Sequence, residues 1–252
     1  MKYKETIAIV NDPEVTLGSL ENNNIVSLNA WELKWEEMTN SYDYIILGGH
    51  MGAYDTDKHD YLLSENKWLS KSVDSGTKIL GICLGSQLVA DSLDGEAYLS
   101  DEIEFGFKNL NFVRNEEIFS DFQETEVFTW HRDTFKIPSK AKLIAETDFP
   151  QIYKIKNTVC IQFHPEVTVE LFDKWYEIDQ MRGGDDSYSI FEFTGNWSNL
   201  KHLDRYGDGY NTLDYDKGWV YRKSGSQPTA SSTSPIYDES QWTNCPECLK
   251  DA

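Results

Sequence analysis

The chain has 252 residues and a formal net charge of −20 at pH 7, with 43 acidic and 23 basic residues. This length is enough for one sizeable α/β domain with an appendage, or for two small domains. So negative a chain repels nucleic acids and anionic membranes, and we expect neither as a partner. The opening MKYKETIAIV lacks the long apolar region of a secretory signal, and no apolar run reaches membrane-spanning length.

In the first part of the chain, apolar β-branched runs that end in turn residues alternate with helical patterns. Residues 61–76 have helical spacing, because Leu62, Leu69 and Val73 can share one face, and Gly76 predicts the end of this helix. Strands that alternate with helices form a mostly parallel sheet. The expected strands are residues 5–10, 24–29, 42–49 and 77–83.

From about residue 98 the pattern changes to successive strands separated by tight turns. This pattern predicts an added antiparallel layer, and residues 168–181 then predict a helix. The expected strands of this part are residues 105–115, 125–131, 141–147, 151–157 and 158–164.

The composition changes again after Arg182, where the chain becomes polar and rich in glycine, serine and aspartate. We therefore predict a domain at 1–182 and a C-terminal extension at 183–252. The stretch SGSQPTASSTSP is typical of a flexible linker, so 223–252 is expected to be a flexible tail. The aromatic residues between 188 and 221 favour packing over the core, with a partner surface as the alternative.

Four cysteines occur in the chain. Cys83 and Cys160 lie in apolar, strand-like segments, and a chain of this length does not need a disulfide framework, so we expect a cytoplasmic protein. Cys245 and Cys248 have the spacing of half a zinc site. Because a second pair is absent, we expect an exposed thiol pair and no metal.

The segment GICLGSQ (81–87) places Cys83 where a buried strand passes into a helix, at the end of a parallel strand where ligands gather. Gly81 and Gly85 complete the pattern G-x-C-x-G, which is typical of the sharp turn that projects a nucleophile. The dipole of the following helix favours the thiolate, and the backbone N–H of Leu84 can bind a developing oxyanion. We therefore predict that Cys83 is reactive and not merely structural.

A thiolate nucleophile needs an oriented base. The segment CIQFHPEV carries His164 at the end of a predicted strand, which Pro165 stops. Glu166 can then hold one imidazole nitrogen while the other faces Cys83. A surface histidine beside a glutamate is common, but together with the upstream cysteine turn this pair predicts a Cys-His-Glu triad.

Four blocks occur in this order in the chain: GGHMGAYD (48–55), GICLGSQLVAD (81–91), WHRDTF (130–135) and QFHPE (162–166). With these blocks, residues 5 to about 180 resemble the class I (triad-type) glutamine amidotransferase domain, and most of all its stand-alone members related to the amidotransferase part of GMP synthase. The resemblance implies an α/β fold with a flavodoxin-like, mostly parallel sheet flanked by helices, an added small antiparallel sheet and a poorly defined C-terminal extension. It also implies that Cys83, His164 and Glu166 are catalytic.

The same resemblance implies the roles of several further residues. An oxyanion hole would be formed by the backbone N–H groups of Gly49 and Leu84. The substrate glutamine would be held by the side chain of Gln87. The remaining substrate contacts would come from the backbone around Met51, Gly52, Trp130 and His131.

Two positions depart from the family pattern. His50 replaces the proline of the usual GGP block, which leaves the N–H of Gly49 available but predicts a less rigid loop. Arg132 stands where a glycine is common. His50 and His131 can also be interpreted as extra catalytic groups, but roles in loop positioning or at the surface are favoured.

Three functions are consistent with these residues. The first is a glutamine amidotransferase that releases ammonia from L-glutamine through a γ-glutamyl thioester on Cys83. Its ammonia would pass to a separate synthase or ligase, because this chain has no nucleotide-binding signature such as a P-loop. The second is a free-standing γ-glutamyl peptidase with the same triad. The third is a catalytically silent regulatory subunit, against which the complete triad argues. No cofactor is expected.

Overall fold

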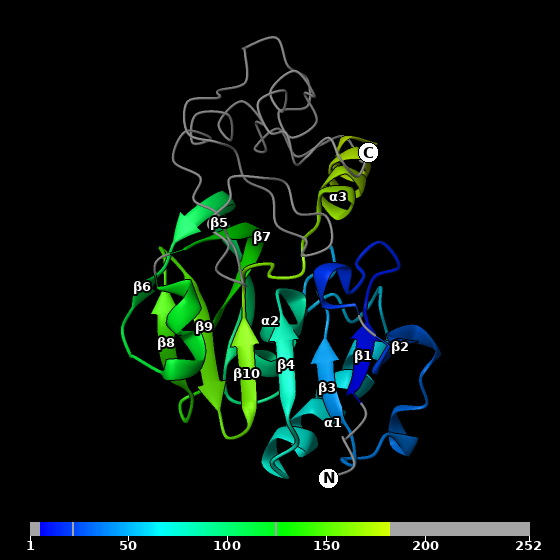
Figure 1. Cartoon of the computed structure of the whole chain (residues 1–252). Coiled ribbons are helices and arrows are strands. Elements are labelled where there is room, and N and C mark those ends of the chain that lie inside the picture. The colour runs from blue at the N-terminus through cyan, green and yellow to red at the C-terminus, as the bar shows by residue number, and fades with distance from the viewer. Residues whose placement is uncertain (1–5, 22, 124, 182–252) are drawn as a thin grey trace.

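The computed structural model describes residues 6–21, 23–123 and 125–181. An eight-stranded sheet forms its centre, in the order β2-β1-β3-β4-β10-β9-β8-β6 (Figure 1). The first five strands of this order run parallel, and β9, β8 and β6 continue the sheet antiparallel. The strands are β1 (Thr6–Val10), β2 (Ile25–Asn29), β3 (Asp43–Ile46), β4 (Ile79–Ile82), β6 (Asn111–Phe112), β8 (Lys142–Glu146), β9 (Pro150–Ile155) and β10 (Thr158–Ile161).

The order of the parallel strands is that of a flavodoxin-like doubly wound fold, in which ligands bind at the carboxyl ends of the strands. The α-helices are α1 (Tyr61–Asp74), α2 (Leu84–Asp91) and α3 (Val169–Met181). Short 3₁₀ helices lie at Gly18–Leu20, Ala30–Glu32, Trp35–Glu37 and Glu117–Phe122.

Alternating strand residues supply cores on both faces of the sheet. Ile9 and Ile46 pack in the core that α1 and α2 cover, whereas Ala8 and Ile45 pack in a separate core on the opposite face. The predicted helix of 61–76 is confirmed as α1. It ends before Gly76, whose positive φ of 79° is the left-handed conformation that terminates many helices.

A second, two-stranded antiparallel sheet is formed by β5 (Glu96–Asn109) and β7 (Glu126–Lys136), with an irregularity between Leu99 and Glu104. The predicted α/β class, with a small antiparallel sheet beside a larger, mostly parallel one, is thus confirmed. The strands expected at 141–164 join the large sheet instead. Strand periodicity gives the two faces of a strand but not its neighbour, and the neighbour of β10 is the distant β4.

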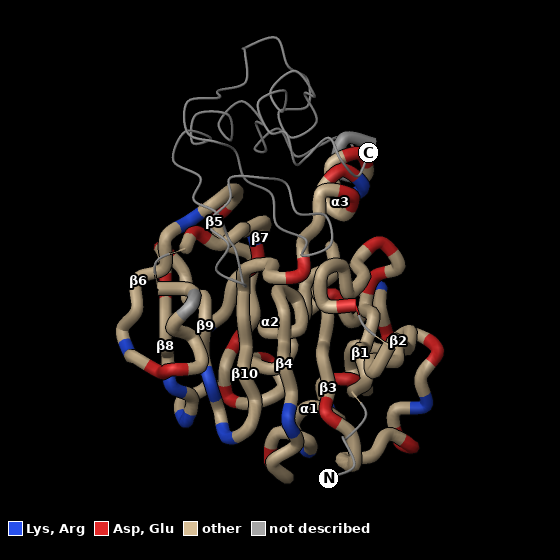
Figure 2. The backbone as a smooth tube through the Cα atoms, in the orientation of Figure 1, with Lys and Arg blue, Asp and Glu red and all other residues tan. Residues whose placement is uncertain are grey.

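The predicted extension 183–252, its tail 223–252 and the pair Cys245–Cys248 lie outside the described residues. Within the described part of the chain, no helix is long and apolar enough to cross a membrane. The same part contains no group of three or more His, Cys, Asp or Glu side chains arranged to hold a metal ion. Figure 2 shows acidic positions on α3 and on the loops near it.

Candidate active site

A cavity of about 430 Å³ lies at the carboxyl ends of the parallel strands. Asp12, Gly49 and Cys83 follow β1, β3 and β4, and all three line it. Further lining residues come from α2, β5, β7 and α3, and from His164 after β10. A cavity of this size at this edge of the sheet is a typical ligand site.

Cys83 occupies a strained turn between β4 and α2. Its φ of 49° is a left-handed value that side chains other than glycine rarely adopt, and such strain is typical of functional sites. The Cys83 N–H donates to Ile161 O at 2.8 Å, and its carbonyl accepts from the Ser86 N–H at 2.9 Å. A Cβ at Gly85 would collide with the carbonyl oxygen of Ile46, so the turn admits only glycine there.

His164 and Glu166 form a buried pair beside this turn. His164 Nδ1 lies 2.8 Å from Glu166 Oε1, and a hydrogen bond also links the imidazole to the side chain of Cys83. The His164 N–H donates to Phe128 O at 2.8 Å, and the ring packs against Trp175 of α3 with centroids 5.0 Å apart. The imidazole is therefore oriented from three sides.

The ionisation of His164 follows from this environment. Burial alone would lower its pKa, but the negative charges of Glu166 and Cys83, together with hydrogen bonds to both, hold the pKa well above its usual value of 6.5. The raised pKa favours the protonated imidazolium of His164 at neutral pH. The charged imidazole of His164 therefore stabilises the folded state. This contribution is complete below pH 6.5 and is lost as the pH rises through the raised pKa of His164.

The predicted oxyanion donors lie next to one another. A Cβ at Gly49 would lie 2.9 Å from Leu84 Cδ2, so the two residues are in close contact. Leu84 is the first residue of α2, and its N–H has no acceptor within the helix. The structure thus brings both donors to the loops that flank Cys83.

Gln87 is buried on α2 with a fixed amide. Its Nε2 donates to Asp133 O at 3.0 Å and to Gln162 Oε1 at 3.2 Å, which uses both of its N–H groups. Only the carbonyl oxygen of Gln87 remains for a ligand in the cavity. A group bound there must therefore be a hydrogen-bond donor.

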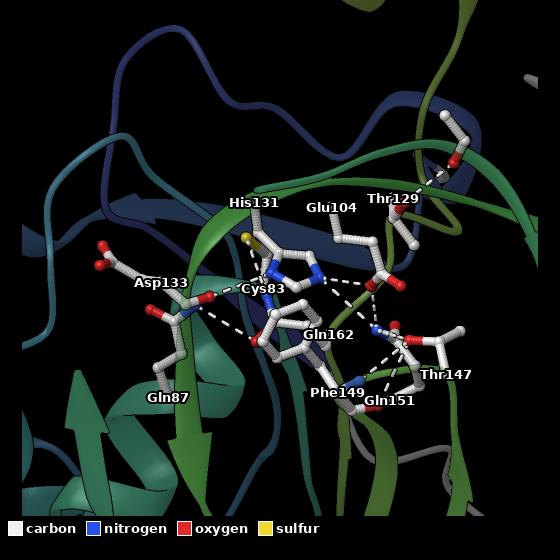
Figure 3. Close-up of polar contacts among 11 residues, drawn as sticks. Cys83, Gln87, Glu104, Thr129, His131, Asp133, Thr147, Phe149, Gln151 and Gln162 are labelled. Atoms are coloured by element: carbon white, nitrogen blue, oxygen red, sulfur yellow. Dashed lines mark hydrogen bonds and ion pairs between the residues drawn. The ribbon is translucent and has the colours of Figure 1, made fainter. Parts of the chain in front are cut away.

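His131 is buried, and not at the surface (Figure 3). Its Nδ1 lies 3.1 Å from Asp133 O, and its Nε2 lies 2.9 Å from Glu104 Oε2, which also accepts from Gln151 Nε2 at 2.6 Å. Because both ring nitrogens face oxygen acceptors, this pair holds β5 against β7 and supports the carbonyl of Asp133. This geometry favours a positioning role for His131.

His50, in the loop that we expected to be less rigid, is tethered to Asp12. Its backbone N–H donates to Asp12 Oδ2 at 3.2 Å, and its Nδ1 contacts the same oxygen. Burial would raise the pKa of Asp12, but hydrogen bonds from His50 and from the Glu14 N–H keep it below its usual value of 3.8. A hydrogen-bonded carboxylate thus restrains this loop.

Of the other predicted contact residues, some line the cavity and one does not. Met51 and Trp130 line the cavity, and so does Arg132, which was not among the predicted contacts. Gly52 does not, because its N–H donates to Asp55 Oδ2 at 3.0 Å and the ring of Tyr54 covers it.

Sequence reasoning missed Asp12, Gln162 and Trp175. Gln162 had a detectable signal, because it lies two residues before His164 and so shares its side of an extended chain. The signal for Trp175 was weaker, because the sequence showed only an aromatic residue on a predicted helix.

Comparison with known proteins gives one family. The model of the glutamine amidotransferase class-I family matches residues 16–181. The glutamine-hydrolysing GMP synthase of Clostridium botulinum is 36% identical over 107 residues, which are 40% of this chain and 21% of that enzyme. The enzyme of the same name from Brachyspira hyodysenteriae is 35% identical over 132 residues, or 49% of this chain and 24% of that enzyme. The matches thus span about a quarter or less of these relatives.

Solved structures of glutamine amidotransferases are also similar to this chain. A glutamine amidotransferase from Thermotoga maritima is 26% identical with a TM-score of 0.68, and the alignment covers 77% of this chain and 89% of that one. A glutamine amidotransferase from Methylobacillus flagellatus is 22% identical with a TM-score of 0.64, covering 73% and 80%. The second likeness shows the fold alone.

The charge of Glu166 should control the protonation of His164. Glu166→Gln removes the negative charge beside Nδ1, which helps to raise the pKa of His164, so this pKa should fall. An NMR pH titration of the His164 imidazole in the full chain measures this change. Glu170→Gln, which neutralises an exposed carboxylate at the start of α3, is the control and should leave the titration unchanged. An unaltered His164 titration in Glu166→Gln would show that the pair is not electrostatically coupled.

Proposed function

This chain belongs to the class-I glutamine amidotransferase family, and we propose that it releases ammonia from L-glutamine through a γ-glutamyl thioester on Cys83. The observation that carries the proposal is the meeting of Cys83, in its strained turn, with the His164–Glu166 pair at one cavity. A thiolate beside an imidazolium supplies both the nucleophile and the proton that an amide leaving group needs.

In the first half of the reaction, the Cys83 thiolate attacks the side-chain amide carbon of glutamine. The negative charge that develops on the amide oxygen is bound by the N–H groups of Gly49 and Leu84. His164 gives its Nε2 proton to the amide nitrogen, which leaves as ammonia, and Cys83 keeps the γ-glutamyl group as a thioester. The accepting oxygen of Gln87 is suited to an N–H group of the substrate.

In the second half, His164 is neutral and acts as a base. It removes a proton from water, which attacks the thioester carbonyl and releases glutamate while the thiolate of Cys83 is regenerated. Glu166 orients the ring and stabilises the imidazolium, and it transfers no proton itself. Water enters and ammonia leaves, so the net reaction is hydrolysis of glutamine to glutamate.

We propose that the ammonia passes to a separate synthase or ligase. The relatives named above are synthases that hydrolyse glutamine, and this chain matches only 21–24% of their length. Synthesis by such a system would therefore need residues outside this chain. Ammonia released into water near pH 7 is protonated and loses its nucleophilicity, which favours delivery within a complex.

The triad assignment predicts the effect of single substitutions. Cys83→Ala should abolish glutamate release from glutamine, and His164→Ala should reduce it by about two orders of magnitude or more, the usual scale of a general acid–base contribution. Steady-state glutamate release measures both. Cys160→Ala, a buried cysteine of β10, and His59→Ala, which lies outside the cavity, are matched controls that should remain active. Normal turnover by Cys83→Ala would refute the assignment and favour a silent subunit or another nucleophile.

Substrate and partner can be tested in one assay. Glutamate release is measured with glutamine and with γ-glutamyl peptides, each with and without an ATP-dependent ligase that co-purifies with the full chain. We expect slow hydrolysis of glutamine by the chain alone and faster turnover with the ligase and its acceptor. Fast cleavage of γ-glutamyl peptides without any partner, with glutamine a poor substrate, would instead identify a γ-glutamyl hydrolase.

A further inference from the structure

We propose that Gln162 is a further catalytic residue, whose amide donates a hydrogen bond to the Cys83 thiolate and keeps the nucleophile ionised. Gln162 Nε2 lies 3.6 Å from Cys83 Sγ, and the Gln162 side chain is fully buried. The proposal rests on the proposed function only in taking Cys83 as the nucleophile. Gln162 follows directly after β10.

The neighbours of the Gln162 amide decide which of its ends faces the sulfur. The carbonyl oxygen of Asp133 can only accept hydrogen bonds, so the group of Gln87 that lies 3.0 Å from it is the amide nitrogen. The same nitrogen lies 3.2 Å from Gln162, which must therefore present its oxygen to Gln87. Gln162 Nε2 is then directed at Cys83 (Figure 3). The orientation follows from hydrogen-bonding chemistry and not from the assignment of one atom.

The backbone around Gln162 holds this donor in place. The Gln162 N–H donates to Gln151 O at 2.8 Å, and the His164 N–H donates to Phe128 O at 2.8 Å. One short segment therefore presents two side-chain donors to Cys83, the amide of Gln162 and the imidazolium of His164. Gln162 and His164 are two positions apart, and in an extended chain residues two apart point to the same side.

The burial of Cys83 makes a second donor important. Cys83 is only 6% exposed, so water does little to solvate its thiolate, and a buried charge needs hydrogen bonds to persist. Hydrogen bonds to ionised acceptors are about twice as strong as neutral ones. When the thioester breaks down, the same donor stabilises Cys83 as the departing thiolate.

The test is the pH dependence of Cys83 alkylation by iodoacetamide in the full chain. Mass spectrometry of the Cys83 peptide keeps the other cysteines out of the measurement. Gln162→Met preserves the approximate size of the side chain but removes the donor. We expect the alkylation midpoint to move up by about one pH unit, and the rate at pH values below the wild-type midpoint to fall about tenfold, which corresponds to the loss of one hydrogen bond to a charged group.

Gln151→Met is the matched control. It makes the same change at an equally buried glutamine that contacts Glu104 and not Cys83, so its alkylation midpoint should equal that of the wild type. Gln162→Glu keeps an oxygen toward Gln87 but places a carboxylate beside the sulfur, so its midpoint should rise further. This variant decides the question if Gln162→Met does not fold.

A wild-type midpoint in a folded Gln162→Met or Gln162→Glu protein would overturn the proposal. Alkylation does not require glutamine to be a substrate. A chain that shows the shift but hydrolyses no glutamine would therefore support the role of Gln162 while refuting the proposed function.

Discussion

The backbone turn at Cys83 is the constraint on which the rest of the site depends. Holding a residue other than glycine at positive φ costs on the order of 1–3 kcal/mol, so the surroundings must enforce it. They do so through the hydrogen bond from Cys83 to Ile161 and through the absence of a side chain at Gly85, which lets α2 approach β3. The same turn places the sulfur over the cavity and the first N–H of α2 beside it.

The polar groups around Cys83 come from both sheets and from α3. His164 follows β10 and is held by Glu166 and by Trp175, while Trp175 Nε1 donates to Glu14 O at 2.8 Å and so ties α3 to the loop after β1. On the other side, Gln87 links α2 to β7. The site is therefore complete only when the parallel sheet, the added β5–β7 sheet and α3 are all in place.

The sequence was informative where chemistry imposes a local pattern. The glycines around Cys83 and the proline after His164 mark turns, and they led to groups that the fold brings together. Contacts between residues that are far apart in the chain give no such local pattern. Asp12 binds His50 from another loop, and the large sheet includes strands that periodicity alone could not assign to it, because alternation describes the faces of a strand and not its neighbour. Gln162 lay within a recognised motif, but its role depends on Gln87 and Asp133, whose proximity only the fold reveals.

The proposed covalent step on Cys83 is tested most directly by rapid acid quench of the full chain during turnover with glutamine, followed by mass spectrometry of the Cys83 peptide. A thioester is expected to appear as a γ-glutamyl adduct on Cys83 that forms before glutamate accumulates and disappears when glutamine is exhausted. Steady production of glutamate with no adduct on Cys83 at any time, under quench conditions that preserve a model thioester, would contradict nucleophilic catalysis by this residue.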